Sequence, residues 1–241
     1  MISIRNVTVR YPGCERTALE GATAEFADGE SVGLVGANGA GKSTLMRAML
    51  GLVPFDGEIA VDGVSLSKKT LADIRRRLGL LMQDSDRQMF MPTVLDDMVF
   101  GPLNHGIGRA DAEARADEIL ARLGIPHLKD RRNDQISGGE KRMAAIATIL
   151  AMEPSALLLD EPTSTLDPAN RRTVIRTLSS LPQTKLVATH DLDLVLDTCS
   201  RVLILDGGRI VADGPSRELL SDRALLESHR LELPLSLQSR A

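Results

Sequence analysis

A glycine-rich stretch early in the chain has the residue types and spacing needed to hold phosphate groups. Residues 36–44 read GANGAGKST, directly after the apolar run 31–35 and directly before a helical pattern. Glycines let backbone N–H groups turn inward, the helix N-terminus adds partial positive charge, the lysine can reach the β- and γ-phosphates and the serine can bind Mg²⁺. This spacing arises by chance on the order of one time in a hundred in such a chain. Nucleotide binding is therefore predicted at Gly36, Asn38, Gly39, Gly41, Lys42, Ser43 and Thr44.

Two adjacent carboxylates end an apolar run further along the chain. Residues 156–159 are apolar, and Asp160 and Glu161 follow them. At the carboxyl end of a parallel strand, both side chains can reach a phosphate site on a neighbouring strand. Asp160 suits the coordination of Mg²⁺, and Glu161 suits the polarisation of a water that attacks the γ-phosphate. A strand that ends at an acidic turn is common by itself, so this interpretation depends on the glycine-rich stretch.

A third segment has the composition of a second anion site. Ser137, Gly138, Gly139 and Glu140 precede the helical run KRMAAIATIL. Serine and glycines at a helix N-terminus can bind an anion, and one nucleotide does not need two such sites in one chain. The same residues also match a plain capping box, because a glutamate stands at the third position after the serine.

The elements around these segments indicate an α/β fold. Short apolar runs predict buried strands at 31–35, 78–82, 156–159, 185–188 and 202–205, with helical patterns between several of them at 42–52, 110–123, 140–152 and 169–181. This alternation predicts a mostly parallel sheet flanked by helices. The more alternating segments 2–10, 22–26 and 57–61 predict a smaller antiparallel N-terminal sheet. We expect one domain over 1–241, with an inserted helical subdomain at about 89–153 and a peripheral tail at about 221–241.

Composition narrows the function classes. The chain has 241 residues, a formal net charge of -4 and 2% aromatic residues, which argues against a nucleic-acid partner. Cys14 and Cys199 are far apart and outside any metal-ligand spacing, so neither a disulfide framework nor a structural zinc site is expected. No apolar run approaches the length of a membrane span or a signal peptide, which predicts that the chain neither crosses a membrane nor enters the secretory path.

The set of motifs resembles the ATP-binding cassette ATPases. The glycine-rich loop, the run ISGGE at 136–140, the run LLLDE at 157–161, the run PTSTLD at 162–167 and His190 after another apolar run stand in the order found in that family. Together with Tyr11 they cover the chain from about residue 11 to residue 213. The resemblance implies a P-loop NTPase core and the hydrolysis of ATP with Mg²⁺ as cofactor.

The resemblance also implies roles for single residues. Tyr11 stands where the family places an aromatic ring that stacks on adenine, although a tyrosine before a proline turn is equally typical of a strand. Gln83 corresponds to the glutamine that contacts Mg²⁺ and the attacking water, and His190 to the histidine that contacts the γ-phosphate. The implied catalytic residues are Lys42, Gln83, Glu161 and His190, and the implied Mg²⁺ ligands are Ser43, Gln83 and Asp160. The histidines at 105, 127 and 229 match no motif and are expected at the surface.

In this family the loop that corresponds to residues 136–140, called the signature loop, closes on the nucleotide of a second chain. The resemblance thus implies a homodimer with Ser137 and Asp167 at its interface, and nucleotide contacts from Ser137, Gly138, Gly139 and Glu140. Ile136 stands where leucine is usual and Glu140 where glutamine is usual. The glutamate adds a negative charge near ATP, which the helix N-terminus offsets by about 0.3–1 kcal/mol. Hydrolysis is still expected, because Lys42, Glu161 and His190 are present.

Residues 83–94 and 99–104 resemble the ATPases of energy-coupling-factor importers, which take up vitamins or transition-metal ions. The tail run LELPLSL is similar to the ends of cobalt and nickel importers of that branch, and a vitamin such as biotin is the alternative solute. Gln88, Met89, Phe90 and Met91 could grip a helix of a membrane partner, or could be ordinary core. The implied partners are an integral membrane coupling protein and a substrate-binding membrane component, with this chain peripheral on the cytoplasmic face of the membrane.

Other ATPase classes fit the sequence less well. A DNA-maintenance ATPase would need a long coiled-coil insertion or a zinc module, and the stretch between Lys42 and Asp160 has no sustained heptads. A translation-type member of the family usually carries two ATPase domains. A GTPase would need an NKxD motif, which this sequence does not contain. A non-transport cassette ATPase therefore remains the less favoured alternative.

Overall fold

Two sheets form the frame of the molecule. The computed structural model describes residues 1–14 and 16–238. The smaller sheet is antiparallel, in the order β2 (Thr17–Phe26), β1 (Ile2–Arg10), β4 (Asp56–Val61) and β5 (Val64–Ser65). The larger sheet has the order β10 (Arg209–Pro215), β9 (Arg201–Asp206), β3 (Ser31–Val35), β8 (Thr184–Ala188), β7 (Ala156–Asp160) and β6 (Leu78–Leu81). Its strands pair in parallel except β10, which is antiparallel to β9. The predicted P-loop α/β fold with an N-terminal antiparallel sheet is confirmed.

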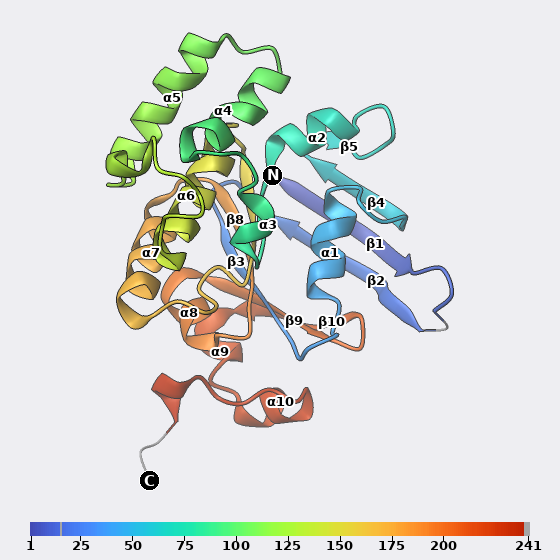
Figure 1. Cartoon of the computed structure of the whole chain (residues 1–241). Coiled ribbons are helices and arrows are strands. Elements are labelled where there is room, and N and C mark those ends of the chain that lie inside the picture. The colour runs from blue at the N-terminus through green and yellow to red at the C-terminus, as the bar shows by residue number, and fades with distance from the viewer. Residues whose placement is uncertain (15, 239–241) are drawn as a thin grey trace.

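Helices cover the larger sheet and extend beyond it (Figure 1). They are α1 (Lys42–Met49), α2 (Leu71–Arg77), α3 (Ser85–Gln88), α4 (Val94–Asn104), α5 (Arg109–Arg122), α6 (Gly138–Leu150), α7 (Pro168–Ser180), α8 (Leu192–Thr198), α9 (Ser216–Leu219) and α10 (Arg223–Ser228), with 3₁₀ turns at Pro126–Leu128 and Leu235–Leu237. The four predicted helices are α1, α5, α6 and α7, with ends shifted by a few residues.

Alternation along the central strands divides the core in two. In β7, Leu158 packs with α1 and the N-terminal sheet, whereas Leu157 and Leu159 pack with α6, α7 and α8 on the other face. Successive side chains of a strand point to opposite faces, so a strand buried on both faces must be apolar throughout. This is why the central strands are continuous apolar runs in the sequence.

The inserted helical segment shares the core of the larger sheet. Met98 of α4, Leu120 of α5 and Ile146 of α6 belong to the same buried cluster as Leu157 and Leu159 of β7. In Figure 1, α4 and α5 lie at the end of the molecule opposite to α10. Because α6 packs against both α4 and β6, it connects the outlying helices to the strands that carry the predicted site.

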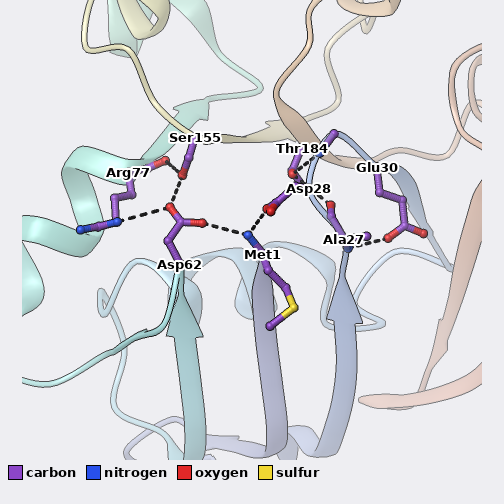
Figure 2. A network of polar contacts seen from close by, with 9 residues as sticks. Met1, Ala27, Asp28, Glu30, Asp62, Arg77, Ser155 and Thr184 are labelled. Atoms are coloured by element: carbon purple, nitrogen blue, oxygen red, sulfur yellow. Dashed lines mark hydrogen bonds and ion pairs between the residues drawn. The ribbon is translucent and has the colours of Figure 1, made fainter.

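Polar contacts connect the sheets at the edge where β1 begins (Figure 2). The Asp62 carboxylate, just after β4, accepts a hydrogen bond of 2.7 Å from Ser155 Oγ and lies 3.4 Å from Nη1 of Arg77. Nearby, Thr184 Oγ1 donates to the carbonyl oxygen of Ala27 at 3.1 Å. These bonds link the start of β7 and β8 to the N-terminal sheet and so fix the orientation of both sheets around α1.

The predicted tail packs against the body of the protein. Leu226 is fully buried in the main core cluster, and Leu231 and Leu233 pack against it. Residues 239–241 of the predicted tail lie outside the described residues. The described part is therefore a docked segment, which the loss of sequence periodicity did not predict.

Candidate nucleotide site

The glycine-rich loop lies tightly between neighbouring strands. It connects β3 to α1 at the carboxyl end of the larger sheet. Gly36 has φ +156°, and a Cβ there would lie 2.2 Å from the carbonyl oxygen of Leu205 on β9. Gly41 has φ +112°, and its Cβ would lie 2.8 Å from the carbonyl oxygen of Ala18 on β2. Both positions require glycine, because a side chain would displace a strand.

A cavity of about 630 Å³ opens over this loop. Its lining brings together residues that are far apart in the sequence, and it adds two residues of the C-terminal segment, Arg230 and Leu231. The predicted site residues that line it are Gly36, Asn38, Gly39, Gly41, Lys42, Ser43, Thr44, Gln83, Asp160, Glu161 and His190.

Lys42 is the cation at the base of the cavity. Its Nζ donates to the carbonyl oxygens of Gly36 at 2.6 Å and Ala37 at 3.3 Å. Burial lowers the pKa of Lys42, and the nearby Glu161 and Asp160 oppose that shift. A buried ammonium that is bonded to carbonyl oxygens alone is a strong site for a phosphate oxygen, because a charged partner offsets the loss of hydration.

The donor set opposite Lys42 fits Mg²⁺. Ser43 Oγ donates to Oδ2 of Asp160 at 3.1 Å, and Gln83 lines the same cavity. Burial raises the pKa of Asp160, so a cation beside it would relieve the cost of its charge. Among the described residues no cluster of three or more His, Cys, Asp or Glu side chains could cage a metal. Mg²⁺ commonly takes one or two protein carboxylates and completes its shell with phosphates and water, and Asp160 with Ser43 offers such a partial set of ligands.

Glu161 is held by donors from the end of β8. Its backbone is left-handed, with φ +49°. Oε2 accepts from Thr189 Oγ1 at 2.9 Å, and Oε1 accepts from the backbone N–H of His190 at 3.0 Å and lies 2.8 Å from Nδ1 of His190. The His190 ring is 72% exposed, whereas the Glu161 side chain is 11% exposed. The arrangement places a buried carboxylate and an exposed imidazole side by side at the cavity.

Arg142 supports Gln83, although it belongs to none of the predicted motifs. Arg142 is 3% exposed, and its guanidinium donates to the carbonyl oxygens of Met82 at 2.7 Å and Gln83 at 2.6 Å. Burial lowers the pKa of this arginine. The only hint in the sequence was that Arg142 directly precedes the mostly apolar helical run 143–150, where a charged side chain needs buried partners. Arg142 therefore fixes the backbone that carries Gln83 to the cavity.

Tyr11 lies beside the site but does not line the cavity. Its hydroxyl is 3.3 Å from Oγ1 of Thr44, and its ring packs on the edge of the N-terminal core. The predicted contact with adenine therefore stays a prediction.

The signature residues stand apart from the cavity of their own chain. Oε2 of Glu140 accepts from the backbone N–H and the hydroxyl of Ser137, both at 2.8 Å. These two bonds, the backbone one first, lower the pKa of Glu140. Gly138 and Gly139 form the first turn of α6, and none of these residues lines the cavity. In one chain they make the capping box that the sequence allowed.

Asp167 is next to the signature residues. A Cβ on Gly139 would lie 2.2 Å from Cγ of Asn170 in α7. Asp167 caps α7 by accepting from the backbone N–H groups of Ala169 at 2.8 Å and Asn170 at 3.0 Å, and these bonds contribute to a lowered pKa. Ser137, Gly139 and Asp167 thus belong to neighbouring helix N-termini.

The segment 88–91 contains both exposed and buried side chains. Phe90 is 63% exposed and packs edge-to-face on Phe100, with ring centroids 5.0 Å apart. Met89 is 5% exposed within the core cluster, so its predicted place in a partner groove is wrong. The Gln88 amide is used internally, accepting from the N–H of Met82 at 3.0 Å and donating to the carbonyl of Ala145 at 3.1 Å. Phe90 and Met91 remain candidates for partner contact.

Comparison with known proteins identifies relatives. A family profile described as ABC transporter matches residues 19–164. The cobalt import ATP-binding protein CbiO of Rhodobacter capsulatus is 42% identical over 98% of this chain and 86% of its own. Other relatives carry only a provisional description as ABC transporter ATP-binding proteins.

Solved structures of ATP-binding cassettes are also similar to this chain. The structure of cbiO1 from Clostridium perfringens, described as part of the transporter complex cbiONQ, superposes with a TM-score of 0.84 at 32% identity over 94% of this chain and 93% of that one. The cassette MJ0796, solved as a dimer in a post-hydrolysis state with ADP and Pi, gives a TM-score of 0.78 at 27% identity over 90% and 99%. None of the helices in the described part of this chain has the length and hydropathy to span a bilayer.

Proposed function

The chain belongs to the ABC transporter family and is an ATPase subunit, and from this premise we propose that it powers an energy-coupling-factor importer of cobalt or nickel ions. The observation that supports a membrane partner is the exposed Phe90–Phe100 pair, which is connected to the nucleotide cavity through the chain between residues 83 and 90. The description of the R. capsulatus relative as a cobalt import protein supports the choice of solute.

The connection between cavity and exposed pair is a series of hydrogen bonds. Arg142 holds the carbonyls of Met82 and Gln83, and Gln88 holds the N–H of Met82. Asp97 of α4 is only 3% exposed. Its Oδ1 accepts from the N–H groups of Phe90 and Met91, both at 3.1 Å. In this proposal, a change at Gln83 is passed to Phe90 along this segment, which hydrogen bonds hold at both ends, and so links ATP to a membrane partner.

The cavity residues perform the hydrolysis in this proposal. The loop backbone and Lys42 bind the phosphates, while Ser43, Asp160 and Gln83 would hold Mg²⁺, which neutralises phosphate charge when bound. Glu161 orients the attacking water and accepts its proton. His190 shares the carboxylate of Glu161 and contacts the γ-phosphate. Removing one such preorganised group typically costs about 10²–10³ in rate, so Glu161→Gln is expected to bind ATP and hydrolyse it at about that reduced rate.

The test compares two adjacent residues. Phe90→Ala should remove an exposed anchor, so the chain co-expressed with the membrane proteins encoded beside its gene should lose co-purification by more than about tenfold, as at an interface hot spot. Its melting temperature and basal ATPase should stay unchanged. The control, Met89→Ala, truncates a core side chain and should cost about 2–5 kcal/mol of folding stability.

Two outcomes would contradict the proposal. If Phe90→Ala retains its membrane partner at wild-type stoichiometry, the exposed pair is not the docking site. If cells that carry the intact complex accumulate labelled biotin and neither Co²⁺ nor Ni²⁺, the solute assignment is wrong and the vitamin alternative takes its place.

A further inference from the structure

The C-terminal segment forms one wall of the nucleotide cavity. After α10 the chain turns at Arg230, whose backbone is left-handed with φ +60°, and Arg230 and Leu231 line the same cavity as the glycine-rich loop. Beyond this turn, the N–H groups of Leu235 and Ser236 donate to the Asp193 carboxylate at 2.9 and 3.1 Å. With Leu226 of α10 buried in the core before Arg230 and Asp193 holding the chain after it, the segment is anchored on both sides, below the core sheet in Figure 1.

Asp206 fixes Arg230 beside the glycine-rich loop. Its carboxylate forms an ion pair with the Arg230 guanidinium and lies 3.2 Å from Nδ1 of His229. His229 was expected at the surface and is instead partly buried in this contact. Asp206 ends β9, and two residues later the N–H of Gly208 donates to the carbonyl of Ala40 in the loop at 3.1 Å. A short bonded path therefore joins Arg230 to the loop.

The charges around the cavity call for a second cation. Two carboxylates line it, Asp160 and Glu161, and among the described lining residues Lys42 and Arg230 are the lysine and arginine side chains. Mg²⁺-bound ATP is still an anion, so the carboxylates oppose its entry. An arginine at the rim reduces that repulsion and offers a planar fork of donors that matches phosphate oxygens.

The position of Arg230 favours the terminal phosphate. Arg230, Leu231 and His190 line both the nucleotide cavity and a neighbouring groove that follows the C-terminal segment. They therefore share one rim of the cavity. His190 is bonded to Glu161, the residue placed at the attacking water, so this rim is on the γ-phosphate side.

We propose that Arg230 is an additional nucleotide-binding residue, which exchanges its ion pair with Asp206 for the γ-phosphate of ATP. This inference rests on the proposed placement of ATP in the cavity. The Arg230 side chain is 68% exposed and the Asp206 side chain 24% exposed, so the guanidinium can leave the carboxylate without opening the core. His229 stays beside Asp206 and partly compensates for that departure. Arg230 lies outside residues 19–164, the region that the family profile matches.

The experiment measures equilibrium binding of two probes to the purified full chain, the Mg²⁺ complexes of ADP and of the non-hydrolysable β,γ-imido analogue of ATP. Arg230→Ala should weaken binding of the analogue about tenfold, the lower end for a charge-assisted hydrogen bond, and that of ADP less than twofold. Arg230→Gln should behave alike. The matched control is Arg223→Ala, because Arg223 pairs with Glu227 inside α10 and does not line the cavity. It should bind both probes as the wild type does.

Asp206→Asn distinguishes a role of Arg230 in nucleotide binding from a role of the Arg230–Asp206 ion pair in folding. It releases Arg230 and should bind the analogue at least as tightly as the wild type. If Asp206→Asn and Arg230→Ala weaken binding equally, the ion pair merely supports the fold and the inference is overturned. It is also overturned if Arg230→Ala binds the analogue like the wild type, or loses both probes to the same extent. A wild-type chain that binds neither probe would refute the proposed ATP site itself.

Discussion

Thr189 controls the orientation of Glu161 through its hydroxyl. The hydroxyl donates to Oε2 of Glu161 at 2.9 Å and accepts from the N–H of Asp191 at 3.0 Å, in a residue with no exposed surface. Asp191 in turn pairs with Arg171 and caps α8. Because its oxygen accepts from the backbone N–H of Asp191, the hydroxyl directs its proton to Glu161, and Thr189 is a positioning group for the carboxylate that we propose as catalytic.

Replacing Thr189 therefore tests how much of catalysis depends on that orientation. Thr189→Val keeps the shape and removes the hydroxyl, so Glu161 can rotate away from the water. We expect kcat to fall about 10–100-fold, the range for a small misplacement of a reacting group, with KM for ATP nearly unchanged.

The serine variant is the control. Thr189→Ser retains the hydroxyl and should recover most of the rate at the same ATP concentration dependence. A valine variant with wild-type kcat, or one in which only KM changes, would show that Glu161 does not need this bond.

Residues within contiguous motifs could be predicted from the sequence, and those that act through tertiary contacts could not. Lys42 and Ser43 belong to one loop whose spacing is itself the signal. Thr189 meets Glu161 across 28 positions, and Arg142 meets Gln83 across 59. Neither pair has a fixed spacing to recognise, because the parallel strands and α6 bring them together only when the sheet forms.

At the scale of elements, the loop 89–92 takes its shape from α4. Oδ1 of Asp97 accepts from the N–H groups of Phe90 and Met91, and Oδ2 accepts from Nδ2 of Asn133. Burial raises the pKa of Asp97. Three donors surround the buried carboxylate and offset the cost of its burial. In the loop that they shape, Met89 is buried and Phe90 is exposed.

We predict that Asp97→Ala disorders this loop. The two backbone N–H groups lose their acceptor, which should cost about 1–3 kcal/mol of folding stability and abolish co-purification with the membrane partner. Basal ATPase should persist, because Asp97 does not line the nucleotide cavity.

Urea unfolding and co-purification measure the two effects. The control is Asp111→Ala, an exposed carboxylate in the first turn of α5. An Asp97→Ala protein that binds its partner normally would show that the loop does not depend on α4.

Elements with a continuous apolar pattern could be predicted from the sequence, whereas edge strands and the loop 89–92 could not. Buried parallel strands such as β7 are continuous apolar runs and were predicted nearly to the residue. The edge strand β10 alternates exposed and half-buried residues, so its sequence carries little signal. Met89 and Phe90 are adjacent and both apolar, and tertiary contacts that the sequence does not show, the packing of Met89 in the core and the bonds that Asp97 accepts from Phe90 and Met91, accompany the difference in their exposure. The predicted groove was wrong at Met89 for this reason.

At the scale of the whole molecule, one chain carries the nucleotide cavity and the residues 137–140 and Asp167 at separate places. The cavity residues lie at the carboxyl end of the larger sheet, while Ser137 and Asp167 stand at the N-termini of α6 and α7 and do not line that cavity. A second chain in head-to-tail arrangement could place its Ser137 over the nucleotide of the first.

ATP is therefore expected to become part of a dimer interface. In Glu161→Gln, nucleotide binds but is hydrolysed slowly, so Mg²⁺ and ATP should shift the chain from monomer to dimer, and ADP should not. Analytical ultracentrifugation with each nucleotide measures the shift. Adding Lys42→Ala to this variant should abolish it, because the phosphates lose their buried cation.

We predict that Glu140 limits the affinity of that dimer. Its carboxylate holds the Ser137 hydroxyl at 2.8 Å, so the hydroxyl must leave a charged acceptor before it can reach the nucleotide of a second chain. Glu140→Gln in the Glu161→Gln background keeps the capping box, since glutamine accepts the same bonds, and removes a negative charge at the helix N-terminus. The ATP-dependent dimer should form at least as readily, with a dissociation constant lower by up to about fivefold, the equivalent of about 1 kcal/mol. A dimer weakened by this change, or a monomer whose ATPase rate per chain is independent of protein concentration, would contradict the head-to-tail arrangement.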